Sequence, residues 1–102
     1  MRIVIEPFLV SAAKDFPKAG AYLDTWRKVV KAAQWHSLAD VRQSYPSADA
    51  VRVQSGRTVL VFNVCGNSYR LIVAVHFNRR IVYTLRFLPH AECSKETWKT
   101  EL

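Results

Sequence analysis

The sequence predicts an α+β domain, in which helices cover one face of a small antiparallel sheet. Apolar residues in the first half recur at helical spacing, and the second half is rich in Val, Ile, Tyr and Phe between turn residues. Half of the 102 residues are hydrophobic, which indicates a folded chain. No linker, repeat or low-complexity segment divides it, so residues 1–102 are expected to form one domain with one core.

The N-terminal quarter predicts a short strand followed by a helix. The strand is "RIVIE", residues 2–6, and Pro7 is suited to the first position of the helix. Three apolar residues then follow at a spacing of four, which places them on one helical face. They are Phe8, Ala12 and Phe16. Pro17 is expected to end this helix.

Two further helices are predicted before the sheet. Residues 18–34 form the longer one, with charged residues outside a single apolar stripe. The stripe consists of Tyr22, Trp26, Val29, Val30 and Ala33. The "SLAD" stretch at 37–40 has the form of a capping box and predicts a short helix that Pro46 stops.

The C-terminal half predicts four strands in an antiparallel meander. They are residues 50–54, 57–64, 68–77 and 81–88. The "SGR" and "CGN" stretches supply turns between them. The closing "SKETWKTEL" predicts a short helix capped by Ser94.

The loop between the last two strands decides which residues share a face. A two-residue loop would pair Phe77 with Arg80 and would place Arg86 on the core face, where a lone arginine is costly to bury. A three-residue loop pairs Phe77 with Ile81 instead, and we expect this register. All the large apolar residues then share one face. The opposite face is predicted to carry Arg70, His76, Thr84 and Arg86.

The charge distribution favours an anionic partner. The net charge is +7, and the region between Asp49 and Glu92 contains six arginines, no lysine and no acidic residue. Arginine presents a planar fork of donors that suits phosphate oxygens and also stacks on bases. We therefore expect nucleic acid as the partner in preference to a merely solubilising surface.

An arginine-bearing sheet face can act on a phosphodiester. Arg70 and Arg86 could hold the phosphate and offset the charge of its transition state, and His90 could move a proton. RNA brings its own nucleophile, the 2′-hydroxyl, so such a site needs no metal. Salt bridges to the helices, or a plain nucleic-acid-binding module, fit the same residues.

His90 and Cys93 leave further alternatives. Their H-x-x-C spacing could seed a metal site, but two ligands are not four, so we expect no metal. A Cys-His nucleophilic pair lacks an identifiable orienting group. His76 could join the arginine face and is the other candidate for the proton transfer, whereas His36 is expected to be structural.

Cellular location is predicted from what the chain lacks. No apolar run approaches the roughly 18 residues that a membrane span needs. The N-terminal "MRIVIEPFLV" is expected to be a strand and not a signal peptide. Two cysteines do not make a disulfide framework. We therefore expect a cytoplasmic protein with no membrane partner.

Two stretches, "FNVCGNSYRLIVAVHF" (62–77) and "VYTLRFLPHAECSK" (82–95), resemble the HigB toxins of bacterial toxin–antitoxin systems. The matching positions are Phe62, Gly66, Asn67, Tyr69, Arg70 and Leu71 in the first stretch and His90, Ala91 and Glu92 in the second. The "SLADVRQSYPSAD" stretch before the first long strand is also similar to this family.

The resemblance implies a RelE-like fold, a small antiparallel sheet with two N-terminal helices on one face. It implies a messenger-RNA interferase that cuts message on the ribosome by metal-independent transesterification through the 2′-hydroxyl, without a cofactor. It also implies a helix-turn-helix antitoxin that neutralises the toxin and represses the operon. Operator DNA would then be contacted only through the antitoxin.

The expected site combines the resemblance with the charge pattern. Arg70 and His90 are catalytic positions carried over from the family, and Arg86 is added from the strand pattern. The residues expected to contact RNA are Arg57, Asn67, Tyr69, His76, Arg79, Arg80 and Lys95.

Two departures from the family pattern leave the activity open. Pro89 stands where the family has threonine, and Cys93 stands where it has tyrosine. Tyr69 or Tyr83 could supply an aromatic ring instead, or the tyrosine is not essential, or this copy is weakened. The alternative is therefore a non-catalytic RNA-binding or antitoxin-docking protein with the same fold. A DNA-binding repressor is disfavoured, because the arginines lie on strands.

Overall fold

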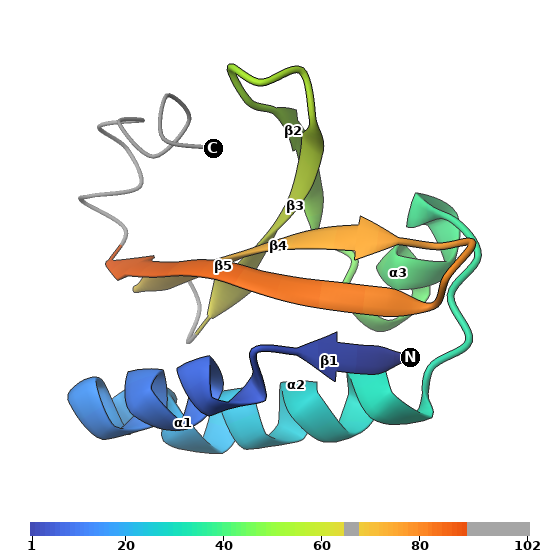
Figure 1. Cartoon of the computed structure of the whole chain (residues 1–102). Coiled ribbons are helices and arrows are strands. Elements are labelled where there is room, and N and C mark those ends of the chain that lie inside the picture. Colours follow the sequence, from blue (N-terminus) through green and yellow to red (C-terminus); the bar gives the residue numbers. More distant parts are fainter. Residues whose placement is uncertain (65–67, 90–102) are drawn as a thin grey trace.

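The computed structural model describes residues 1–64 and 68–89, so the predicted "CGN" turn and C-terminal helix lie outside the described residues. The chain forms helices in its first half and a sheet in its second, as predicted (Figure 1). The helices are α1 (Glu6–Asp15), α2 (Gly20–Ala32) and α3 (Leu38–Ser44), with a short 3₁₀ turn at Pro17–Ala19. The strands are β1 (Arg2–Val4), β2 (Asp49–Arg52), β3 (Thr58–Val64), β4 (Tyr69–His76) and β5 (Ile81–Pro89).

The sheet has the strand order β1-β5-β4-β3-β2. Strands β2 to β5 form the predicted antiparallel meander. Strand β1 adds to its edge parallel to β5, which makes the sheet mixed. Helices α1 and α2 lie together against one face of the sheet (Figure 1). We call the other side of the sheet, away from these two helices, the open face.

The main core lies between the helices and the sheet. Helix α2 buries Leu23, Trp26 and Val30, while the other stripe residues pack at the margin of the core. The Trp26 ring meets Phe62 of β3 edge-on, with the ring centroids 5.6 Å apart. The amphipathic pattern of this segment therefore places α2 as the sequence predicts.

The hydrogen bonds at the helix ends differ from the capping that the sequence predicts. Ser37 precedes α3 but makes no side-chain capping bond, so the predicted capping box does not form. The Asp40 carboxylate accepts a hydrogen bond from the backbone N–H of His36 instead, at 2.8 Å. At the end of α2 the Met1 ammonium donates to the carbonyls of Val30 and Ala33, at 2.9 and 2.7 Å. A positive charge at a helix C-terminus satisfies carbonyls that have no partner within the helix.

The register of β4 and β5 differs from the prediction. His76 pairs with Ile81, so the connecting loop has four residues, Phe77 to Arg80, and not three. A two-residue loop would give the same register at the start of β5. If β5 continued without interruption, this register would place Arg86 on the core face. A β-bulge prevents that outcome. Val73 pairs with Thr84 and Ile72 with Arg86, which leaves Leu85 as an extra residue.

The bulge changes which face each β5 residue occupies. Before it, Tyr83 pairs with Ala74 on the open face, whereas Val82 and Thr84 face the helices; after it, Arg86 lies on the open face. The predicted placement of Arg86 is confirmed, but those of Tyr83 and Thr84 are wrong. The prediction that all large apolar residues share one face is also wrong, because a second cluster lies on the open face. It comprises Val53, Val59, Val61 and Ile72, with Val51, Leu85 and Leu88 packed against it.

Thr84 ties β5 to the junction of β1 and α1. Its side chain is 2 % exposed, and its hydroxyl donates to the Ile5 carbonyl at 2.9 Å. Thr84→Val keeps the shape but removes the donor, so we expect a loss of about 1 kcal/mol in the free energy of unfolding. Urea denaturation measures it, and Thr84→Ser is the control that keeps the hydroxyl. A valine variant as stable as the wild type would contradict a stabilising role for this bond.

Candidate nucleic-acid interface

Two arginines from neighbouring strands lie together on the open face. Arg70 of β4 pairs with Leu88 of β5, and Arg86 of β5 pairs with Ile72 of β4. The arginines are therefore diagonal neighbours across one strand pair, a relation in which Cα atoms are roughly 7–8 Å apart. Side chains as long as arginine reach across that spacing. The structure thus brings together two residues that are sixteen positions apart in the chain, so that both can contact one phosphate.

Both arginines lie partly buried beside the second apolar cluster. The Arg70 guanidinium donates to the Tyr69 carbonyl at 3.3 Å, and the Arg86 guanidinium donates to the Leu85 carbonyl at 2.8 Å. Ile72 of β4 lies opposite Arg86, on the same face as Arg70, and is fully buried. Among the side chains that the structure describes, no carboxylate lies within ion-pair distance of Arg70. A cation with apolar neighbours interacts with a phosphate more strongly than one surrounded by water.

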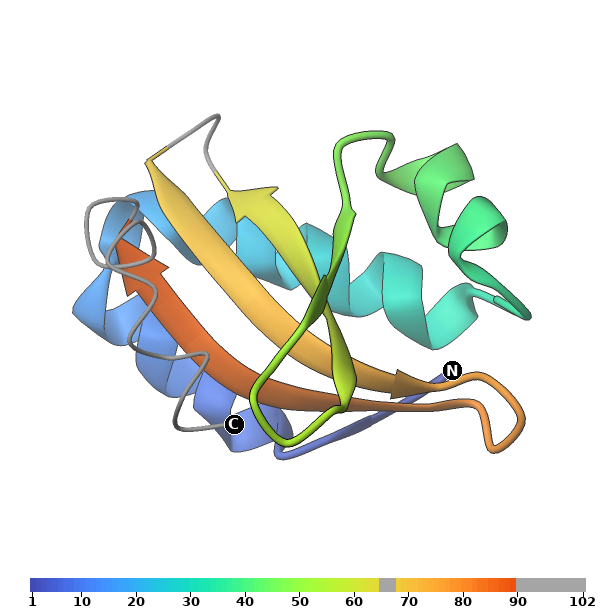
Figure 2. The ribbon, with the colours of Figure 1, turned by 90° about the horizontal axis from the view of Figure 1, so that it is seen from above.

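The β2–β3 hairpin arches over the open face. It rises from the sheet on the side away from α1 and α2 (Figure 1), and seen from above it crosses over β4 and β5 (Figure 2). The second apolar cluster joins the hairpin to β5, because Val53 of the hairpin packs in the same cluster as Leu85 and Leu88 of β5. The exposed Arg57 lies at the end of this hairpin. The open face is therefore bounded by strands and by the hairpin, and it is not a flat solvated surface.

Asn63 belongs to this face but was not predicted from the sequence. It pairs directly with Arg70 across β3 and β4 and is half-buried. Residues directly opposite each other in an antiparallel pair have Cβ atoms about 4.5–5.5 Å apart. Extending the alternation of β3 to its last residues is the signal that would have found it, because Val59, Val61 and Asn63 are the open-face positions of that strand.

Tyr69 does not share a face with Arg70. Its ring stacks on Phe87 with the ring centroids 5.4 Å apart and contacts Phe16 at 5.2 Å, on the helix side of the sheet. Tyr83 is the tyrosine that the bulge leaves on the open face, where its ring meets His76 edge-on at 5.3 Å. His76 lies six residues along β4 from Arg70, a separation of about 20 Å. The structure therefore does not bring His76 to the arginine pair.

The remaining predicted residues divide into two groups. Arg79 and Arg80 are exposed in the β4–β5 loop, at the end of the sheet remote from Arg70. Asn67, His90, Cys93 and Lys95 lie outside the described residues. The last described residue of β5, Pro89, pairs with Tyr69 next to Arg70. The described part of β5 therefore ends at the same end of the sheet as Arg70.

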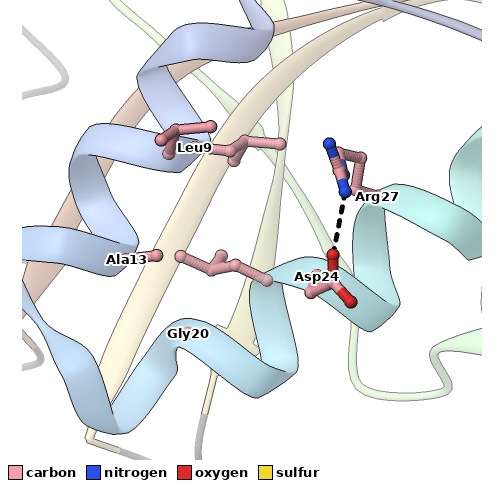
Figure 3. Close-up of a pocket in the computed structure, with 7 residues that line it drawn as sticks. Leu9, Ala13, Gly20, Asp24 and Arg27 are labelled. Atoms are coloured by element: carbon pink, nitrogen blue, oxygen red, sulfur yellow. Dashed lines mark hydrogen bonds and ion pairs between the residues drawn. The ribbon is translucent and has the colours of Figure 1, made fainter.

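A small hollow between α1 and α2 is lined mainly by apolar side chains, unlike the open face with its arginines. It has a volume of about 160 Å³, and its lining includes Leu9, Ala13 and Gly20 (Figure 3). The Asp24–Arg27 ion pair, 2.9 Å long, lies at its rim. Hydrogen bonds from Lys28 and Arg27 lower the pKa of the Asp24 carboxyl. This hollow is apolar and carries a neutralised ion pair at its rim, whereas Arg70 on the open face has no described carboxylate partner. The open face is the better candidate for a phosphate.

The described residues contain no group of three side chains suited to hold a metal ion. None of the helices in the described part of the chain is long and apolar enough to cross a membrane.

The fold and the site together define a small basic α+β protein with a pair of arginines on the open face of its sheet. A family described as the HigB toxin, the RelE-like toxic component of a toxin–antitoxin system, matches residues 19–96. The chain belongs to this family, and its α+β architecture is consistent with a RelE-like fold. A search of curated proteins found no match. As the toxic component of such a system, the protein has an antitoxin as its partner.

Proposed function

We propose that this toxin is an endoribonuclease that cleaves messenger RNA on the ribosome. The observation that supports it is the diagonal pair of Arg70 and Arg86 on the open face, beside a buried apolar cluster. Two planar guanidinium forks at that spacing suit the non-bridging oxygens of one phosphodiester. The net charge of +7 assists binding to any RNA, whereas the paired arginines account for action at one phosphate.

The proposed reaction is an internal transesterification. The ribose 2′-oxygen attacks the neighbouring phosphorus as its proton is removed, and the bond from phosphorus to the 5′-oxygen breaks as that oxygen is protonated. The products are a 2′,3′-cyclic phosphate and a 5′-hydroxyl. Arg70 and Arg86 stabilise the extra negative charge on the phosphate oxygens in the transition state. No metal or cofactor takes part in the proposed reaction.

Proton transfer is assigned to His90 in this proposal. Histidine can take or give a proton near neutral pH. His90 follows Pro89 directly in the chain, and Pro89 pairs with the residue next to Arg70, whereas His76 lies about 20 Å from Arg70 along β4. The geometry of the described residues therefore favours His90 over His76. Of the two tyrosines, only Tyr83 lies on the open face, where an unstacked base could meet it.

The wider RNA-binding surface and the antitoxin complete the proposal. Arg57, Arg79 and Arg80 are exposed and are assigned to RNA backbone, with Asn67 and Lys95 as further contacts. Tyr69 is left out, because its ring packs on the helix side. A helix-turn-helix antitoxin would neutralise the toxin and bring it to operator DNA.

Arg70→Ala tests the proposed activity. We expect the single-turnover rate of message cleavage on purified ribosomes to fall roughly 10²–10³-fold, as when one preorganised donor to a developing charge is lost. The wild type should cleave in the presence of a chelator and leave a cyclic phosphate. Lys14→Ala on α1 is the matched control, since Lys14 is exposed on the helix side and its loss changes the net charge equally.

Growth arrest upon expression is the second readout of the same variants. Equal toxicity of the wild type and Arg70→Ala would overturn the role of the arginine pair. Absence of both toxicity and cleavage in the wild type would instead favour the non-catalytic binding protein, and RNA binding by the wild type would then be the activity that Arg70→Ala reduces.

A further inference from the structure

Strand β3 ends with an amide side chain on an otherwise apolar face. Its open-face positions are Val59, Val61 and Asn63. The two valines are buried in the second apolar cluster, whereas Asn63 is half-buried and stands outside that cluster. Asparagine is depleted in strands, because its short polar side chain packs poorly on a pleated surface. Packing therefore does not account for an asparagine at this position.

The Asn63 amide makes no hydrogen bond with any residue that the structure describes. Arg70, which pairs directly with it, donates its guanidinium to the Tyr69 carbonyl instead. A carboxamide offers two N–H donors and one carbonyl acceptor. On a half-buried side chain these groups are available to water or to a bound ligand.

Asn63, Arg70 and Arg86 lie on three adjacent strands at one end of the open face. Arg70 stands in the middle, since it pairs with Asn63 of β3 and is the diagonal neighbour of Arg86 of β5. Neighbouring strands are about 4.8 Å apart, and an asparagine side chain is much shorter than that of arginine. A phosphate held between the two arginines therefore has Asn63 to one side of it. The amide is placed to meet a group attached to that phosphate.

The ribose is the part of a nucleotide that best fits the amide. A second phosphate favours a cation, and the amide carries no charge. A base favours an exposed apolar surface on which to stack, but Val61 and Ile72 beside Asn63 are both buried. A ribose hydroxyl is both a donor and an acceptor, as the amide is.

We infer that the Asn63 amide oxygen accepts a hydrogen bond from the 2′-hydroxyl that attacks the phosphate held by Arg70 and Arg86. This inference rests on the proposed function, since it concerns the same site. The contact orients the hydroxyl toward the phosphorus atom. An amide does not titrate near neutral pH, so Asn63 takes no proton, and proton transfer stays with His90.

Two messages test this contact, one with every hydroxyl present and one with 2′-deoxyribose at the cleaved position. We expect Asn63→Ala to lower the single-turnover cleavage rate of the hydroxyl message on purified ribosomes roughly 10-fold, as for the loss of one hydrogen bond. The deoxy message cannot react and serves as a competitive inhibitor. Its inhibition constant should be the same for both proteins, because it lacks the contact in each. The pH profile of cleavage should keep its shape.

Asn78→Ala is the matched control, because it makes the same exchange at an exposed position of the β4–β5 loop. It should leave the cleavage rate and the inhibition constant unchanged. Inhibition of Asn63→Ala at the wild-type concentration of deoxy message also shows that this variant is folded. A raised inhibition constant for Asn63→Ala would place the contact elsewhere on the message and overturn the inference. Cleavage by Asn63→Ala at the wild-type rate would overturn it as well.

A wild type that cleaves neither message separates this inference from the proposed function. The endonuclease activity would then fail, and both messages can be compared by direct binding on ribosomes. Tighter binding of the hydroxyl message by the wild type, lost in Asn63→Ala, would keep the contact between the amide and the hydroxyl. Equal binding of the two messages by the wild type would rule that contact out.

Discussion

Replacing Arg70 and Arg86 together by lysine is expected to reduce message cleavage roughly 10²–10³-fold, although the net charge stays at +7. Lysine keeps a positive point charge but lacks the planar fork that binds two phosphate oxygens at once. The two arginines occupy diagonal positions across β4 and β5, where the shorter reach and single donor group of lysine cannot reproduce the same contacts. The chemical step should therefore be lost more than RNA affinity.

The measurement is the single-turnover cleavage rate on purified ribosomes, with RNA affinity determined in parallel. Arg42→Lys/Arg52→Lys is the control, because it makes the same two exchanges on α3 and β2, outside the arginine pair. A lysine variant of Arg70 and Arg86 that cleaves at the wild-type rate would show that charge alone suffices. The assignment of bidentate phosphate binding would then be wrong.

Trp26→Ala is expected to lower the free energy of unfolding by about 3–5 kcal/mol, the range for an aromatic core residue that leaves a cavity. Trp26 is completely buried, and its ring contacts Phe62 between α2 and the sheet. A domain of this size has a stability of about 5–15 kcal/mol, so the loss is a large part of the total. Thermal and urea unfolding measure it.

Trp26→Phe is the informative comparison for the same position. The indole Nε1 is buried and has no hydrogen-bond partner among the described residues. A buried donor without a partner is destabilising, so removing it offsets part of the volume that phenylalanine loses. We expect a stability loss well below that of the alanine variant. Similar losses for both variants would show that the indole N–H finds a partner in solution.

The helices and the antiparallel meander of β2 to β5 could be predicted from the sequence. Pro7 and the apolar spacing that follows it mark α1, and the stripe that includes Trp26 marks α2, because helical period and burial are local properties of a segment. In β4, the alternation of side chains along the strand identified Arg70 as a residue of the open face. The arginines and their lack of acidic neighbours in sequence pointed to an anionic partner before any contact was known.

Long-range pairing was not predictable in the same way. The sequence indicates a strand at the N-terminus but not that it joins β5 in parallel, so the placement of Arg2 beside Arg80 was missed. Asn63 was missed because its position opposite Arg70 depends on how β3 pairs with β4. Such contacts depend on which edges and faces remain available when the whole sheet packs on its helices.

The period of each segment, the basic character of the second half and the cost of burying Arg86 follow from the residues alone. How that cost is avoided depends on the packing of the sheet against the helices. Val82 and Phe87 both pack in the core between the sheet and the helices, yet they are five residues apart, and an odd separation places two residues on opposite faces of a regular strand. One extra residue between them is required, and Leu85 is that residue. It packs in the cluster beneath the hairpin, and Arg86 emerges on the open face beside Arg70.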